Sequence, residues 1–242
     1  MAINVNEVYQ TVLYILNKEQ RGYVTPAEFN KLATQAQLDI FEKYFEDLNQ
    51  ALRMPENDSE YANRVKTIQE KIDIFESSET LGATKKLSDN VHRLGTLEYP
   101  INLPLLQPVE LQEMTRHDFN LAKRSKLTAP TSTFPAFTIS GDNITTAPTS
   151  LDGDEITVYF TKKPKDPIWG YTIGQVGEFL YDDRVYDEAS TPTGSRDFEI
   201  SAIDKPEIIM SILMYAGVII RDQQIIQAAA GKIAQDNQNE KS

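Results

Sequence analysis

The sequence predicts an α+β protein: a helical bundle of three N-terminal helices and one C-terminal helix, with an inserted small antiparallel β region and an extended loop or arm. Two observations predict this class. Apolar residues recur at intervals of three and four in residues 6–76 and again after residue 204, the spacing of amphipathic helices. From residue 81 onward, glycine and proline become frequent and short alternating runs replace that spacing, as in strands and turns.

The clearest predicted helix covers residues 25–52. Thr25 can cap it, Pro26 suits its first position, and Glu28 completes a capping box. At ~1.5 Å per residue this helix is roughly 40 Å long, so other helices must pack along it. Its apolar stripe consists of Phe29, Leu32, Ala33, Ala36, Ile40, Phe41, Tyr44, Leu48 and Leu52.

Two further helices are expected beside it. Residues 6–18 form the first, with Asn4 or Asn6 as its cap, and a turn at Gly22 folds it back as a helical hairpin. The third helix carries a lengthwise seam of apolar residues. This seam consists of Tyr61, Val65, Ile68, Ile72 and Phe75. Residues 1–80 therefore form a predicted helical domain.

Residues 81–200 form the predicted β-rich region, with a short helix at 107–121. Gly141-Asp142 is a two-residue hairpin signal. In residues 155–162, apolar and polar side chains alternate, so one face of that strand is buried. Further strands are expected at 94–99, 101–106, 137–140 and 143–146.

An extended acidic loop is predicted at residues 166–197. Trp169 is expected to anchor an ordered excursion at its start, because Pro164 and Pro167 exclude a central strand there. The loop is interpreted as a surface loop or an extended hairpin. The alternative is an arm that orders against another chain, and its aromatic residues are then interface candidates. The interface candidates here are Trp169, Phe179, Tyr181 and Tyr186.

The C-terminal helix is predicted over residues 201–236. It starts near Asp204, with Pro206 in its first turn and Glu207 completing a second capping box. Its first half is apolar on all sides, so it must be enclosed, and we expect it to pack back on the bundle. Residues 237–242 are expected to be a disordered tail.

Charge is unevenly distributed in this chain of net charge −12. Residues 81–127 carry 7 basic and 5 acidic side chains, whereas 166–200 carry 2 and 8. The acidic total argues against a nucleic-acid-binding protein, because phosphate contacts need a basic face. The basic group Lys123, Arg124 and Lys126 is most simply solvated surface. Alternatively, it meets an acidic partner or the acidic segment of a neighbouring copy.

Catalytic signals are lacking in the sequence. There is no cysteine, the two histidines His92 and His117 lie far from any triad pattern, and no phosphate-binding or zinc motif occurs. The acids at 152–155 and 182–183 are typical of turns. We therefore expect no enzyme, no cofactor and no metal site. No secretory signal is recognised, and the longest apolar run, 208–220, is shorter than the ~18 residues of a membrane span.

Six segments carry a resemblance to a known family. They read NKEQRGYVTPAEFN (17–30), AQLDIF (36–41), FPAF (134–137), VYFTKKPKDPIW (158–169), DFEI (197–200) and YAGVIIRD (215–222). In this order they resemble the head-to-tail connector proteins, adaptors or neck rings, of short-tailed bacteriophages.

The resemblance implies a structural virion protein, assembled in the host cytoplasm and located in the neck or tail. It implies a homo-oligomeric ring of about a dozen copies that contacts the portal and other tail or ring proteins. DNA passes through the lumen of such a ring without specific binding, during packaging, retention and ejection. The alternative is a tail accessory or another non-ring virion protein.

Overall fold

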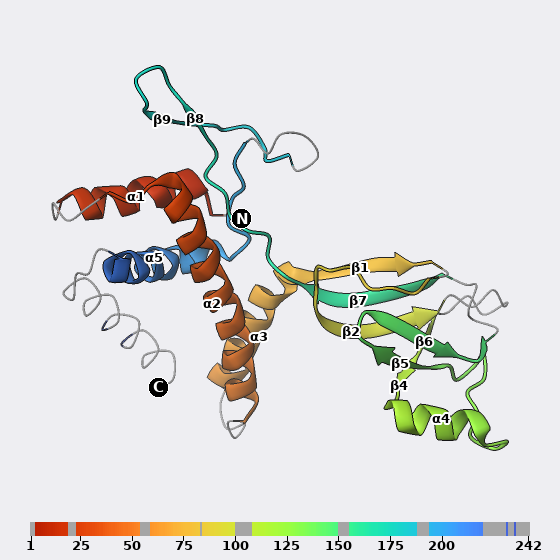
Figure 1. Cartoon of the computed structure of the whole chain (residues 1–242). Coiled ribbons are helices and arrows are strands. Elements are labelled where there is room, and N and C mark those ends of the chain that lie inside the picture. Colours follow the sequence, from red (N-terminus) through yellow and green to blue (C-terminus); the bar gives the residue numbers. More distant parts are fainter. Residues whose placement is uncertain are drawn as a thin grey trace. The chain divides into compact units, whose positions relative to one another are not determined.

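The computed structural model describes residues 3–18, 23–53, 59–82, 84–99, 108–149, 155–187, 194–219, 231 and 235. The fold is α+β, as predicted, and its helices and sheets are drawn in Figure 1. The chain forms two compact units: a helical unit of Met1–Ile74 and Pro164–Ser242, and a β unit of Phe75–Lys163. The acidic loop therefore belongs with the helices, whereas the sequence grouped it with residues 81–200. The predicted tail at 237–242 lies outside the described residues.

Helices α1 (Val5–Lys18) and α2 (Pro26–Arg53) begin at the predicted caps. The Asn4 side-chain oxygen accepts the Glu7 backbone N–H at 3.1 Å. At the start of α2, Glu28 accepts the Thr25 backbone N–H at 2.9 Å, and the Thr25 hydroxyl accepts the Glu28 backbone N–H at 3.4 Å. The capping box is confirmed, and it satisfies two donors that the helix itself leaves unpaired.

The buried face of α2 differs from the predicted stripe at its C-terminal end. Leu52 is 58% exposed, whereas Phe45 and Ala51 are buried. Steps of four residues rotate about 40° around a helix, so a stripe followed from Tyr44 through Leu48 turns away from the core. Steps of seven rotate only about 20°, which keeps Ala51 on the buried side.

Helices α2 and α5 (Lys205–Ile219) make the helix–helix contacts that hold the helical unit together. Helix α2 packs against α3 (Ser59–Ile72) and against α5, and α1 also packs against α5. Within the described part of α5, the residues facing inward are Ile208, Ser211, Ile212, Leu213 and Ala216. The second half of the predicted C-terminal helix, apart from residues 231 and 235, lies outside the described chain.

The start of α5 is fixed by acids that contact other helices. A 3-10 turn, η3 (Ala202–Asp204), leads into α5, and Asp204 is 7% exposed. Its carboxylate accepts hydrogen bonds from the Tyr44 hydroxyl and from the Lys71 ammonium, the latter at 2.8 Å. Glu207 pairs with Lys43 at 2.8 Å. The predicted second capping box is therefore wrong: both acids bind side chains of α2 and α3, where charged partners stabilise them more.

The larger sheet of the β unit is antiparallel, with the order β1-β7-β2-β3. Its strands are β1 (Glu76–Leu81), β2 (Val91–Tyr99), β3 (Val109–Glu110) and β7 (Ile156–Lys162). The predicted alternation in β7 is confirmed, since Ile156, Val158 and Phe160 are buried and Tyr159 is 42% exposed. Strand β1 was not predicted, because only Leu81 of its six residues is apolar.

A second sheet contains the predicted hairpin. Its strands β4 (Gln112–Glu113), β5 (Ala136–Ser140) and β6 (Asn143–Ala147) lie in that order, with β4 parallel to β5. Gly141 turns the hairpin at φ 61°, a conformation that favours glycine. The shared core of the two sheets consists of Leu81, Leu97, Leu111, Phe137, Ile144, Ile156, Val158 and Phe160.

The short helix of the β unit begins later than predicted. Helix α4 covers Arg116–Arg124, and the Thr115 hydroxyl caps it by accepting the Asp118 N–H at 3.3 Å. Residues 109–113 are extended instead, because buried Leu111 donates its N–H to Leu97 at 2.9 Å. Burial and sheet pairing thus override the helical spacing of this segment. The strand predicted at 101–106 lies outside the described residues.

Replacing Thr25 by alanine tests the capping box. We expect Thr25→Ala to lower the free energy of unfolding of the helical unit by about 1 kcal/mol, because the Glu28 backbone N–H in the first turn loses its acceptor. The measurement is denaturant unfolding followed by helical circular dichroism. Thr11→Ala is the matched control: Thr11 lies inside α1 and donates to Glu7 O at 2.7 Å, so alanine there costs little. Equal losses in both variants would contradict the capping role.

Candidate functional site

Trp169 anchors the segment that leads into the acidic loop, as predicted. It is 5% exposed. Its backbone N–H donates to the Asn30 side chain at 2.8 Å, and its carbonyl accepts from the Asn30 amide at 3.3 Å. The indole N–H donates to the Asn6 side-chain oxygen at 3.0 Å. Three hydrogen bonds to side chains of α1 and α2 therefore hold Trp169, whose segment makes no backbone pairing with these helices.

Aromatic rings surround this anchor. The Trp169 ring centroid lies 4.5 Å from that of Tyr9, 5.6 Å from that of Tyr181 and 6.0 Å from that of Tyr171. Tyr9 comes from α1 and donates its hydroxyl to Val24 O at 3.1 Å. Tyr171 and Tyr181 come from the two sides of the loop. The indole thus connects the loop to the helices through packing as well as hydrogen bonds.

A buried glutamine makes a second attachment to α2. Gln37 is 1% exposed and lies within the apolar face of the helix. Its amide donates to Lys165 O at 2.8 Å, and its side-chain oxygen accepts the Glu199 N–H at 3.1 Å. Both ends of the predicted loop, before residue 166 and after residue 197, are therefore tied to one side chain.

The loop contains a two-stranded hairpin, so the extended-hairpin interpretation is confirmed. We use "the arm" for residues 171–187 and 194–197. Strands β8 (Tyr171–Ile173) and β9 (Phe179–Tyr181) pair antiparallel, with Tyr171 opposite Tyr181 and Ile173 opposite Phe179. The hairpin stands out as a ribbon carrying these two labels in Figure 1.

Large apolar side chains of the arm are exposed to solvent. Five of them show exposed fractions between 37% and 93%: Ile173, Val176, Phe179, Leu180 and Val185. Five such residues within the arm are typical of an interaction site, whereas single exposed apolar residues are common on any surface. The arm is the candidate functional site.

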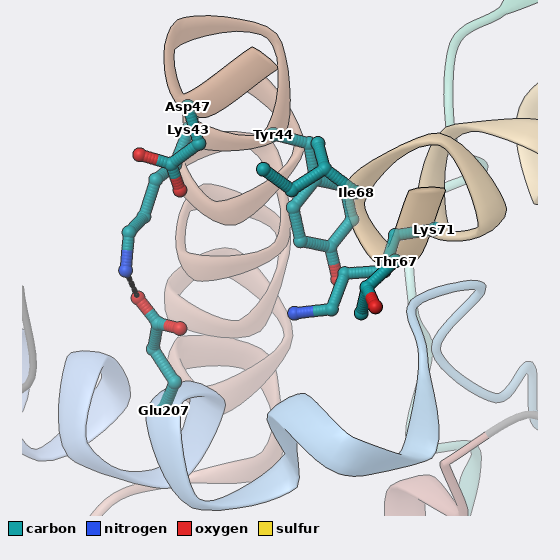
Figure 2. A pocket seen from close by; sticks show the side chains of 7 residues that line it. All are labelled: Lys43, Tyr44, Asp47, Thr67, Ile68, Lys71 and Glu207. Atoms are coloured by element: carbon teal, nitrogen blue, oxygen red, sulfur yellow. Dashed lines mark hydrogen bonds and ion pairs between the residues drawn. The ribbon is translucent and has the colours of Figure 1, made fainter. Parts of the chain in front are cut away.

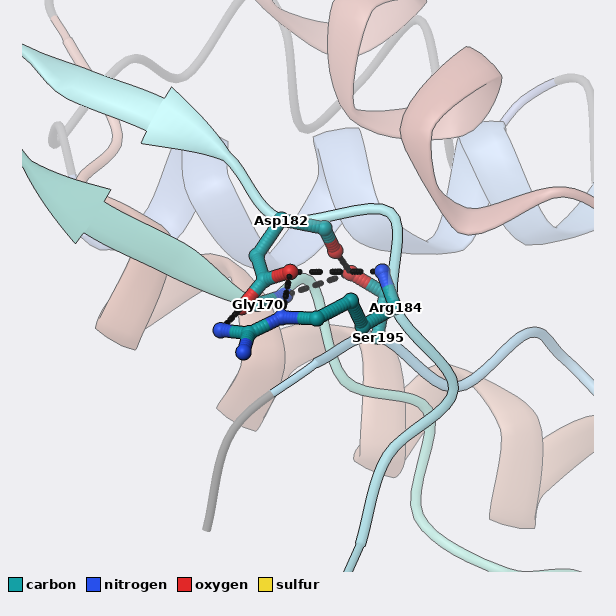
Figure 3. A network of polar contacts seen from close by, with 4 residues as sticks. All are labelled: Gly170, Asp182, Arg184 and Ser195. Atoms are coloured by element: carbon teal, nitrogen blue, oxygen red, sulfur yellow. Dashed lines mark hydrogen bonds and ion pairs between the residues drawn. The ribbon is translucent and has the colours of Figure 1, made fainter. Parts of the chain in front are cut away.

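A polar clamp closes the base of the arm (Figure 3). Arg184 donates to both carboxylate oxygens of Asp182, at 2.8 and 2.6 Å. Ser195 accepts the Gly170 N–H at 2.9 Å and donates its hydroxyl to Asp182 O at 2.5 Å. The guanidinium of Arg184 lowers the pKa of the Asp182 carboxyl to about 2. The Asp182 carboxylate therefore stays charged through the ordinary carboxyl range, down to a pH of about 2.

Three of the predicted interface residues in the loop contact other aromatic rings, and the fourth, Tyr186, contacts an arginine. Trp169 and Tyr181 lie against each other, and Phe179 packs on Tyr171 with ring centroids 5.0 Å apart. Tyr186 lies 4.5 Å from the guanidinium of Arg196, a cation–π contact. The surface of Trp169 is buried by contacts within the chain. A subunit-interface role stays a prediction for Phe179, Tyr181 and Tyr186.

The basic residues Lys123, Arg124 and Lys126 lie in the β unit. Lys123 and Arg124 form the last turn of α4, and Lys126 follows in the next turn; all three are exposed. The ammonium of Lys123 lies 5.4 Å from the Phe119 ring centroid. Positive charge at a helix C-terminus is favoured by the helix dipole.

Sequence reasoning missed the side-chain amides that dock the loop. Asn6, Asn30 and Gln37 are ordinary polar residues of helices when each is considered alone. Gln37 carried one usable signal, since it lies between Ala36 and Ile40 on the apolar stripe. A polar residue at such a position is buried only with hydrogen-bonding partners.

A separate cavity lies among α2, α3 and α5. Its volume is about 260 Å³, and it is lined by Lys43, Tyr44, Asp47, Thr67, Ile68, Lys71 and Glu207 (Figure 2). Its lysines are neutralised inside the chain: Lys43 by Glu207 and Lys71 by Asp204, each at 2.8 Å. These ion pairs join three helices, so the lining serves the packing of the unit.

Among the residues that the structure describes, no group of three or more potential ligands, His, Cys, Asp or Glu, is placed to hold a metal ion. None of the described helices combines the length and the apolar character needed to cross a bilayer.

A comparison with protein-family models found no match, and neither did a comparison with curated proteins.

Removing the Asn30 amide tests the anchor. We expect Asn30→Ala to lower the free energy of unfolding by about 1–3 kcal/mol, because the buried N–H and carbonyl of Trp169 lose their partners. Trp169 is the only tryptophan, so its fluorescence reports the anchor directly, and its emission should shift to longer wavelength. Gln35→Ala is the control, since Gln35 is an exposed amide on the same helix. An unshifted emission in Asn30→Ala would contradict the anchoring role.

Trypsin cleavage after Arg184 tests the clamp. We expect Asp182→Asn to accelerate it, because the neutral amide cannot accept two charged hydrogen bonds and the arm opens more often. Asp183→Asn removes the same charge from the neighbouring exposed position and is the matched control. Fragment mass spectrometry gives the rate at this bond. Faster cleavage in the control, with Asp182→Asn unchanged, would assign the effect to protease preference instead.

Proposed function

We propose that this chain is a structural virion protein that forms a ring in the bacteriophage neck, between the portal and the tail. The observation that carries the proposal is the arm: a hairpin tied to the helices at its base and apolar at its surface. The order of the six sequence segments that resemble the connector family supports the same assignment. The proposal assigns the chain no catalytic chemistry, no cofactor and no metal.

In this proposal the four helices act as a bundle that holds the arm in place, and the β region is an insertion into that bundle. Support comes from the hydrogen bonds of Asn6, Asn30 and Gln37, which join the segment leading into the arm to α1 and α2. A preformed arm loses little conformational entropy when it meets a partner. Such a preformed element suits a ring that assembles once and then stays assembled.

A ring is built by repeating one head-to-tail contact until it closes, so each copy needs two different complementary faces. Residues 166–200 are acidic, with 8 acidic and 2 basic side chains. The end of α4 is basic, with Lys123, Arg124 and Lys126 exposed. Opposite charge on two different surfaces guides association and disfavours like-to-like pairing.

The net charge of −12 also fits a conduit for DNA. A channel that passes the genome in both directions must not bind phosphates tightly, and a predominantly acidic subunit repels them. Portal and other tail or ring proteins are the partners that this position in the neck requires.

The copy number in purified virions tests the proposal. We expect about one copy per portal subunit, because a neck ring and the portal stack along a common axis. Quantitative mass spectrometry with the portal as internal reference gives the ratio. A ratio several-fold higher or lower would move the chain to a tail accessory role. Absence from virions would contradict a structural role altogether.

A further inference from the structure

The loop after α4 presents two large apolar side chains to solvent. Leu127 is 94% exposed and Phe134 is 79% exposed, although both are large enough to belong in a core. Leu121, on α4 itself, is 54% exposed. The cations Lys123, Arg124 and Lys126 lie on the same helix end and loop. We call Leu127, Phe134 and these three cations the basic knob.

Hydrogen bonds give the knob a defined shape. The Ser125 hydroxyl oxygen accepts the N–H groups of Leu127 at 3.3 Å and Thr128 at 3.2 Å. Thr131 and Phe134 exchange backbone hydrogen bonds of 3.2 and 3.1 Å, which closes a tight turn. The two apolar side chains are therefore held by turns whose backbone is already ordered, the arrangement expected of interface anchors.

We propose that the basic knob of one copy docks on the arm of a second copy; this inference rests on the ring proposed above. Charge argues for this occupant. The arm surface combines exposed Ile173, Val176 and Leu180 with the acids Glu178 and Asp183, the opposite sign to the knob. Apolar anchors inside a rim of opposite charges form the usual anatomy of a specific interface.

A second copy is the proposed occupant because one chain carries both surfaces. Knob and arm are different surfaces of the same sequence, so each copy offers one and receives the other. That is the requirement of a head-to-tail contact. The Ser195 hydroxyl joins the Gly170 N–H and Asp182 O at the base of the arm, and the knob is held by turns. Association therefore orders few side chains.

The absence of cysteine from the chain allows a direct test by cross-linking. One full-length chain carries Leu127→Cys, and another, with a size tag, carries Val176→Cys. The two are mixed at high concentration and treated with a short bismaleimide. Because each chain has a single thiol, a product of mixed size reports only contacts between copies. We expect the 127–176 product to exceed both like-with-like products several-fold.

Two controls decide the interpretation. Tyr14→Cys, on α1 and 73% exposed, replaces Leu127→Cys as a thiol outside the knob and should give only background product with Val176→Cys. Reversing Lys123, Arg124 and Lys126 to glutamate should suppress the 127–176 product several-fold. Adding Glu178→Lys and Asp183→Lys to the Val176→Cys chain should restore it. Circular dichroism checks that each variant is folded.

The outcomes separate this inference from the neck-ring proposal. Product at background level, dominant like-with-like products, or no recovery on charge exchange overturns the docking of knob on arm. A portal-like copy number in virions would leave the ring in place even then. Conversely, specific cross-linking by a protein absent from virions would support the docking and contradict the neck assignment.

Discussion

The attachment of the segment around Trp169 to α1 and α2 is the interaction on which the helical unit depends. The backbone groups of those helices are already paired within the helices. The buried backbone groups of this extended segment therefore need side chains of the helices as partners. Asn30 and Gln37 supply them from one face of α2, while Asn6 fixes the indole. Without these amides, the apolar face of α2 could not be covered by an extended chain.

Local signals predicted the elements that depend on nearby residues. Thr25 and Glu28 start α2, Gly141 turns the β5–β6 hairpin, and alternation identifies β7. Each signal is contained in a few consecutive residues. The anchoring of the loop by Trp169 was also predictable, because a tryptophan that closely follows two prolines in a polar stretch is expected to be buried.

Contacts between distant residues could not be predicted. Strand β1 is polar and exists because β7, some 80 residues later, pairs with it along its whole length. Asp204 looked like a helix cap, but Lys71 and Tyr44 bind its carboxylate in the fold. Asn30 lies 139 residues before Trp169. In each case the partner, not the residue itself, decides the role, and the partner is known only once the chain is folded.

The proposed role of the arm and the knob in assembly accounts for the distribution of apolar exposure. Folding alone would favour burying Val176, Leu127 and Phe134, or replacing them by polar residues. Instead, hydrogen bonds order the backbone that carries them: Ser125 accepts the Leu127 N–H in the knob, and the Glu178 carboxylate accepts the Val176 N–H in the arm. Ordering a loop that keeps its apolar side chains in water stabilises the single chain little. It becomes favourable when a second surface removes those side chains from water, at about 25 cal/mol per Å² of apolar area.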